Sequence, residues 1–204
     1  MLLDSYHALI KDPEGDAPII FAFHGTGGDE HQFFEFTQRV RPGAGVVSPR
    51  GDVTEKGASR FFKRTGEGVY DMKDLARATS KMSRFVADIK AQDSTRLVFG
   101  FGYSNGANIL ASVMIEAPEL FDRVGLLHPL IPWSPSPVPG LKGTRVLITA
   151  GHHDPICPWQ KTQELTAWIE DQGAKITTHF HEGGHEMREE ETSALADLLH
   201  HDTS

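Results

Sequence analysis

Cysteine is almost absent from this chain, since Cys157 is the only one among 204 residues. An intrachain disulfide framework is therefore excluded, and we expect a cytoplasmic protein that lives in a reducing compartment. No run of 18 apolar residues occurs, and residues 1–10 contain no lysine or arginine. We therefore expect neither a membrane span nor a signal peptide.

Positive charge is also in short supply. Lysine and arginine together number 20 against 28 aspartates and glutamates, which gives a formal net charge of −8. Such a balance, without any basic run, argues against nucleic acid or an anionic membrane as the partner. The length and the 39% share of hydrophobic residues predict one buried core and a single domain over residues 1–204.

Internal repeats are missing as well, and short apolar runs alternate with helical patterns instead. Strands are expected at residues 18–23, 45–47, 95–103, 123–127, 145–149 and 175–180, and helices at 30–40, 73–92, 107–117, 159–171 and 186–201. Strands separated by helices form βαβ units, which require a mainly parallel sheet. The sequence therefore predicts a three-layer α/β fold with helices on both faces of a central sheet.

Two long segments, at about 49–72 and 129–143, interrupt this alternation. Long loops in compact domains are often lids or binding loops. Both segments follow expected strands, at the edge where open α/β sheets bind their ligands. We therefore expect them to be lid-like loops over a site at that edge.

The most informative segment is an apolar run that ends in Gly102-Tyr103-Ser104-Asn105-Gly106 and continues into a helical pattern. A Gly-x-Ser-x-Gly turn between a strand and a helix exposes the serine hydroxyl, and its glycines avoid a collision with the neighbouring elements. A serine hydroxyl is a weak nucleophile that needs a base to take its proton. Ser104 is therefore the candidate nucleophile, and a base must be sought elsewhere in the chain.

Two residues are placed to complete this site. Asp154 follows the strand expected at 145–149, and His185 follows the strand expected at 175–180, so both lie at the same sheet edge as Ser104. The order Ser, Asp, His is that of the α/β-hydrolases. We predict that His185 is the base and Asp154 the carboxylate that orients it. The structural alternatives, without a catalytic role, are that Asp154 caps a turn and that His185 caps the last helix.

Other chemistries stay open at this point. His152, His153, His181 and His185 could instead form a cluster that holds a catalytic metal ion, although no His-Glu-x-x-His helix is present. Cys157 is a weaker candidate nucleophile because no glycine-rich turn surrounds it. A non-catalytic protein that uses the same fold to bind a small ligand is the remaining alternative.

Acyl transfer develops negative charge on a carbonyl oxygen, which calls for backbone N–H donors beside it. One donor is expected at Asn105, directly after the serine. The other is expected in the loop His24-Gly25-Thr26-Gly27-Gly28, where small residues let the backbone approach a substrate and Thr26 is the expected donor. His24 is expected to buttress this loop.

Several segments together resemble the phospholipase/carboxylesterase family of α/β-hydrolases, and in particular small bacterial esterases of the hydroquinone-resistance type. The residues that carry the resemblance are Phe23-His24-Gly25-Thr26-Gly27-Gly28-Asp29-Glu30, Pro49-Arg50-Gly51, Arg60-Phe61-Phe62, Gly102-Tyr103-Ser104-Asn105-Gly106-Ala107-Asn108, His128-Pro129, Asp154-Pro155 and Gly184-His185. They span nearly the whole chain in the expected order.

The resemblance implies a serine hydrolase that cleaves carboxylic esters through Ser104, His185 and Asp154, with Thr26 and Asn105 as oxyanion donors. It implies no cofactor, no metal and a small-molecule ester substrate, and it leaves thioesters, lysophospholipids and a homodimer open. Four residues are expected to form the substrate pocket, Arg60, Phe61 and Phe62 from the first loop and Trp133 from the second. Related acyl-protein thioesterases usually have leucine at the position of Thr26, which speaks against long acyl thioesters.

Overall fold

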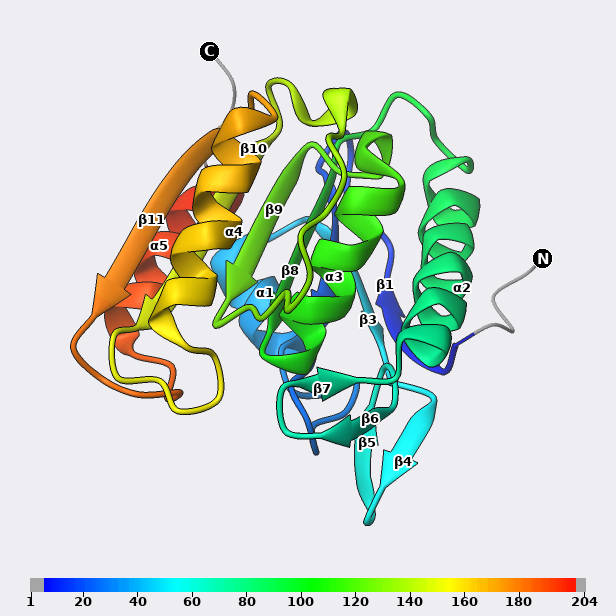
Figure 1. Cartoon of the computed structure of the whole chain (residues 1–204). Coiled ribbons are helices and arrows are strands. Elements are labelled where there is room, and N and C mark those ends of the chain that lie inside the picture. Colours follow the sequence, from blue (N-terminus) through cyan, green and yellow to red (C-terminus); the bar gives the residue numbers. More distant parts are fainter. Residues whose placement is uncertain (1–5, 201–204) are drawn as a thin grey trace.

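The computed structural model describes residues 6–200 and centres on one seven-stranded sheet (Figure 1). The strands run in the order β1-β3-β2-β8-β9-β10-β11. Their bounds are Ala8–Lys11 for β1, Ile19–Phe23 for β2, Gly45–Pro49 for β3, Val98–Tyr103 for β8, Arg123–Leu127 for β9, Arg145–Gly151 for β10 and Lys175–His181 for β11. Only β1 is antiparallel to its neighbour, so the sheet is mainly parallel.

Helices cover both faces of this sheet and complete three layers. They are α1 (Phe34–Val40), α2 (Met72–Lys90), α3 (Asn105–Glu116), α4 (Trp159–Asp171) and α5 (Glu189–His200). In the view of Figure 1, α2, α3 and α4 lie in front of the sheet, whereas α1 and α5 lie behind it. The expected three-layer α/β architecture is confirmed.

The alternation of side chains along β2 shows why helices must pack on both faces of the sheet. All five residues of this strand are buried. Phe21 and Phe23 belong to the core cluster beneath α2, α3 and α4, while Ile20 and Ala22 belong to the cluster beneath α1 and α5. A strand that is apolar on both faces is stable only in the middle of a layered structure, as expected of a parallel sheet.

Several elements differ from the expectation. Helix α1 begins at Phe34 instead of residue 30, and α5 begins at Glu189 instead of residue 186, while residue 201 lies outside the described part of the chain. The segment 49–72 contains two small antiparallel hairpins, β4 (Val53–Glu55) with β5 (Ala58–Arg60) and β6 (Arg64–Gly66) with β7 (Val69–Tyr70). The segment 129–143 contains only one short 3₁₀ turn, Pro139–Leu141.

The carboxyl ends of the parallel strands position the candidate site. Ser104 follows β8, His128 follows β9, Asp154 follows β10, and His185 follows β11. The two hairpins lie along this same edge (Figure 1). Within residues 6–200, no helix is long and apolar enough to cross a membrane.

Candidate active site

Ser104 occupies a strained turn between β8 and α3. Its φ of 52° and ψ of −117° lie in a region that residues with a β-carbon rarely adopt. The turn is held because the Ser104 N–H donates to the Leu127 carbonyl at 2.9 Å. A β-carbon on Gly106 would lie 2.2 Å from the carbonyl oxygen of Phe23, and one on Gly102 would lie 2.5 Å from Gly106. Both glycines are therefore required for α3 to pack this close to the sheet.

The structure brings Ser104, His185 and Asp154 into one hydrogen-bonded chain. The Ser104 hydroxyl lies 2.8 Å from His185 Nε2, and His185 Nδ1 lies 2.6 Å from Asp154 Oδ2. Because an ionised carboxylate only accepts hydrogen bonds, Nδ1 carries the ring hydrogen and donates to Asp154. The lone pair on Nε2 then faces the serine hydroxyl, which is the tautomer that a general base requires.

The loops that carry Asp154 and His185 are joined to each other by their backbones. The His153 N–H donates to the Gly183 carbonyl at 2.9 Å, and a β-carbon on Gly151 would lie 2.1 Å from the Gly184 carbonyl oxygen. Tyr103 adds a further restraint, since its hydroxyl donates to the His185 carbonyl at 2.6 Å. These contacts keep the imidazole of His185 between its two partners.

Asp154 is completely buried yet remains ionised. Burial alone would raise its pKa, but hydrogen bonds from His128, from His185 and from the backbone N–H groups of Cys157 and Ile156 hold the pKa well below its usual range. His128 Nδ1 lies 2.9 Å from Asp154 Oδ2, the same oxygen that His185 contacts. Sequence reasoning assigned no role to His128, and its place in the His128-Pro129 pair was the only available signal.

The two expected oxyanion donors lie beside the serine. Thr26 and Asn105 line the same cavity as Ser104 and His185. The donor expected at Asn105 is its backbone N–H. The Asn105 side chain is engaged elsewhere, because its Oδ1 accepts a hydrogen bond from the Phe61 N–H at 2.8 Å. His24 buttresses the Thr26 loop, since its buried ring lies 2.7 Å from the Gly25 carbonyl and accepts the Gly51 N–H at 2.9 Å.

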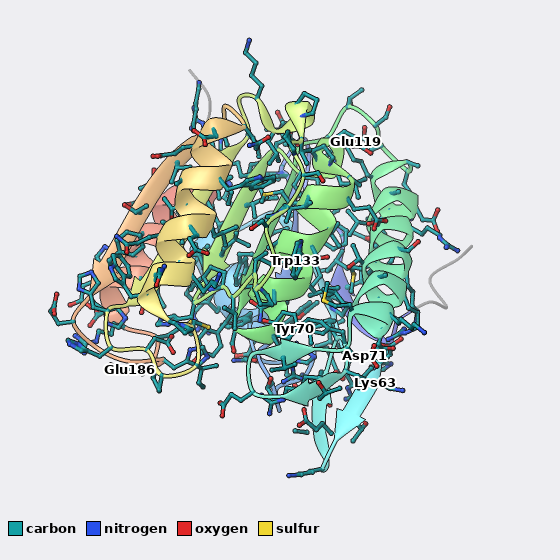
Figure 2. The ribbon with its side chains drawn as sticks, in the orientation of Figure 1. Lys63, Tyr70, Asp71, Glu119, Trp133 and Glu186 are labelled. Atoms are coloured by element: carbon teal, nitrogen blue, oxygen red, sulfur yellow. The ribbon has the colours of Figure 1, made fainter. Side chains whose placement is uncertain are left out.

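The cavity over Ser104 has a volume of about 270 Å³ and a wall of mixed polar and apolar residues. Its members that sequence reasoning did not select are Arg64, Glu67, Gly68, Tyr70, Tyr103, Asn108, Leu130, Ile156 and Cys157. Asn108 holds two sides of this wall together, because it donates to the Tyr70 hydroxyl at 2.8 Å and accepts the Leu130 N–H at 2.7 Å. Tyr70 lies among the hairpins at the edge of the sheet (Figure 2).

Of the four expected pocket residues, only Arg60 lines the cavity. Its buried guanidinium donates to the Thr26 hydroxyl at 2.6 Å and to the Phe62 carbonyl at 3.2 Å. The expectation for Phe61 and Phe62 is wrong, because both rings are fully buried in the core, where they anchor the hairpin segment. The expectation for Trp133 is wrong as well. Trp133 packs beside α4 (Figure 2) and lines a separate pocket that does not contain Ser104.

The expected alternative of a metal cluster is contradicted for the four histidines proposed. His152 Nδ1 lies 2.6 Å from Glu182 Oε1, and His153 Nδ1 lies 2.8 Å from the Glu182 carbonyl. His181 instead faces Glu191, at 3.2 Å, and His185 faces Ser104 and Asp154. The four rings therefore do not converge on one point.

Cys157 lines the cavity but lacks the features of a nucleophile. Its thiol is 1% exposed and lies 3.2 Å from the His128 carbonyl, to which it donates. Burial, together with the nearby charge of Asp154, raises the pKa of this thiol. A reactive cysteine requires the opposite shift.

Together, the layered sheet and the Ser104 turn with its His185 and Asp154 partners define the class of α/β-hydrolases. A Bacillus subtilis (strain 168) protein described as "Putative hydrolase MhqD" is 35% identical over 175 residues, 85% of this chain and 88% of that protein. The crystal structure of a Bacillus cereus carboxylesterase matches with 30% identity and a TM-score of 0.86, covering 95% of this chain and 93% of that one.

The Agrobacterium tumefaciens (strain C58) protein Atu2452, whose function is unknown, matches with 50% identity, a TM-score of 0.91 and 98% coverage of both chains. No protein-family model matches the sequence. On these relationships the chain belongs to the phospholipase/carboxylesterase family of α/β-hydrolases, and it is a carboxylesterase-type hydrolase. This membership favours an enzyme over a non-catalytic binding protein.

Proposed function

We propose that the protein is a serine esterase that hydrolyses small carboxylic esters through an acyl-enzyme intermediate on Ser104. The observation that carries this proposal is the hydrogen-bonded chain from Ser104 through His185 to Asp154, with separations of 2.8 and 2.6 Å. These separations lie in the range through which a base can take a proton from a nucleophile.

The chemistry follows from the tautomer of His185. Nε2 takes the proton of the Ser104 hydroxyl while the serine oxygen attacks the ester carbonyl carbon. The resulting imidazolium is stabilised by Asp154, and it returns the proton to the departing alkoxy oxygen, which leaves an acyl ester on Ser104. Water, deprotonated by the same nitrogen, then attacks this acyl group. The bond to Ser104 breaks, the imidazolium returns the proton to the serine oxygen, and the acid is released.

The negative oxygen formed in both steps is assigned to the backbone N–H groups of Thr26 and Asn105. Asn105 begins α3, so its N–H belongs to the positive end of that helix. The Thr26 loop is supported by the buried His24 ring and by Arg60. Donors that are fixed in advance stabilise developing charge without having to reorganise.

The size of the cavity supports short esters better than lipids. Its volume of about 270 Å³ lies at the lower end of ordinary ligand pockets. Arg60, Arg64 and Asn108 place charged and amide groups among its apolar side chains, so the wall is not continuously apolar as a long acyl chain would need. We therefore propose short-chain esters as the substrates, in preference to lysophospholipids and long acyl thioesters.

A fluorophosphonate probe and a chain-length series of nitrophenyl esters test this function. We expect the probe to label Ser104 and turnover to fall as the acyl chain lengthens. Ser104→Ala should abolish labelling and lower turnover by about 10⁴-fold or more. Ser136→Ala, the same change at an exposed serine of the 129–143 segment, should alter neither.

The outcomes distinguish the alternatives. Labelling and turnover that survive Ser104→Ala but disappear in Cys157→Ala would assign the reaction to the thiol. Activity that survives both changes and is lost with a chelator would assign it to a metal ion. Faster hydrolysis of palmitoyl than of acetyl esters would contradict the proposed substrate size.

A further inference from the structure

A second histidine lies behind the proposed catalytic chain, where the ester reaction as described does not use it. His128 is completely buried, and its Nδ1 lies 2.9 Å from Asp154 Oδ2. Its other ring nitrogen, Nε2, lies 3.0 Å from Glu191 Oε1, and the Glu191 side chain is completely buried too. This second contact has the distance of an ion pair, although the N–H is not aligned with the oxygen as in a hydrogen bond.

The two carboxylates determine the charge of His128. Burial would raise the pKa of both acids, but the contact with His128, together with further hydrogen bonds, lowers the pKa of Asp154 and of Glu191. Ionised carboxylates accept hydrogen bonds and donate none. Each nitrogen of His128 must therefore carry a hydrogen, and a ring that is protonated on both nitrogens is positively charged.

The same cluster has the composition of a metal site, because nitrogens of His128 and His181 and an oxygen of Glu191 lie within 4.8 Å of one another. The hydrogen bonds argue against that function. The Gly183 N–H donates to His181 Nδ1 at 2.9 Å, so the hydrogen of this ring sits on Nε2. A metal ion needs a lone pair, whereas His181 Nε2 presents an N–H toward Glu191 Oε2 at 3.2 Å.

We propose that His128 is a permanently protonated imidazolium, neutralised by Glu191, that positions Asp154 for its contact with His185. Burial opposes this charge, but hydrogen bonding to Asp154 and then the proximity of Glu191 raise the pKa of His128 to about 9. The ring is thus charged throughout the neutral range. The role assigned to it in catalysis rests on the proposed function of Ser104 and His185.

The charge of His128 acts on His185 across a short distance. The two ring centres lie 5.1 Å apart, and both rings contact the same oxygen of Asp154. The positive ring of His128 therefore lies beside the ring that takes the serine proton in the proposed mechanism, and like charges repel.

The other titratable groups around His128 do not supply this effect. His181 lies with its ring centre 5.6 Å away, Tyr103 lies 5.8 Å away, and the Cys157 thiol contacts the His128 backbone. The pKa of Tyr103 is raised to about 12, chiefly by burial, and that of Cys157 is raised as well, so both are neutral near pH 7. The charges that matter in this cluster are therefore those of Asp154, Glu191 and His128.

The charge is tested on the wild-type protein by nitrogen NMR of the histidine rings. We expect both nitrogens of His128 to be protonated at pH 7 and to stay so until the pH approaches 9. A non-protonated nitrogen on this ring at pH 7 would overturn the proposal. The measurement needs no turnover, so its result stands apart from the outcome of the Ser104→Ala experiment.

The effect on catalysis is tested by the acid limb of the pH profile of kcat/KM in two variants. His128→Gln keeps a hydrogen-bond donor but removes the positive charge, and it should move this limb about 1 pH unit upward. Glu191→Gln removes the carboxylate that helps to hold the charge on this ring, so it should move the limb upward as well, by a smaller amount. The double variant should match His128→Gln, because Glu191 acts through the charge of that ring.

The direction of these shifts distinguishes an electrostatic role from a structural one. If His128 and Glu191 only supported the loops, both variants would lower kcat and leave the acid limb in place. That result, or shifts of the two variants in opposite directions, would overturn the proposal. His179→Gln, on β11 and outside this cluster, is the matched control and should leave the profile unchanged.

Discussion

Two histidines share one oxygen of Asp154, and their surroundings give them opposite properties. His185 lies 2.6 Å from Oδ2 with its side chain 16% exposed, whereas His128 lies 2.9 Å from it with none exposed. The far nitrogen of His185 faces the neutral hydroxyl of Ser104, and that of His128 faces the carboxylate of Glu191. A hydroxyl can give up a proton to the ring, but an ionised carboxylate cannot. The far partner, more than the shared aspartate, therefore decides whether a histidine is a base or a fixed charge.

The largest expected effect separates the two rings by activity. His185→Gln should lower kcat/KM for a short nitrophenyl ester by about 10⁴-fold or more, because the base itself is lost. His128→Gln should lose far less, since Asp154 keeps its bonds from His185, Ile156 and Cys157. Steady-state kinetics checks both values. Equal losses of kcat/KM in the two variants would contradict the different roles assigned to His185 and His128.

The next effect separates the two rings by stability. The folded-state pKa of His128 is raised from 6.5 to about 9. The charge on His128 therefore contributes fully to the free energy of unfolding below pH 6.5, and this contribution is lost as the pH rises through 9. The contribution is on the order of 3 kcal/mol. Urea unfolding across this window should show the decline in the wild type and a flatter curve in His128→Gln. A wild-type free energy of unfolding that stays constant over the window would contradict the assigned charge.

The smallest effect concerns Tyr103, whose ring lies 5.4 Å from His185 and 5.8 Å from His128. Tyr103→Phe removes the 2.6 Å hydrogen bond to the His185 carbonyl and should cost about 1 kcal/mol of stability. Turnover should fall modestly because the His185 loop is less restrained. The acid limb of the pH profile should not move, since the lost hydroxyl carries no charge. A shift of this limb in Tyr103→Phe would show that the profile reports loop position instead of charge.

Much of the layered fold could be predicted because its signals are local. Apolar runs such as Ile19–Phe23 and the helical spacing in Met72–Lys90 are properties of neighbouring residues, and both elements form nearly where they were expected. The starts of α1 and α5 were misjudged by three or four residues. Helix ends depend on capping and packing as well as on periodicity, and they are correspondingly hard to locate.

Some residues of the candidate site could be predicted from the sequence, and others could not. Ser104, Asp154 and His185 could be found because each lies within a few residues of the end of a strand, so a parallel sheet brings their positions to one edge. Phe61 and Phe62 were misjudged because an aromatic pair in a loop looks the same whether it faces a ligand or the core. Only the packing of the hairpin segment against α3 and β2 reveals that these rings are buried.

By itself, the sequence determined the layered α/β architecture, the serine turn and the order of its two partners, because these follow from residue spacing and from strand direction. The tertiary structure alone decided that His128 meets both Asp154 and Glu191. Those three residues come from the ends of β9 and β10 and from α5 on the far face of the sheet. Burial then makes their contacts decisive, because a charged group without water must take its partners from distant parts of the chain.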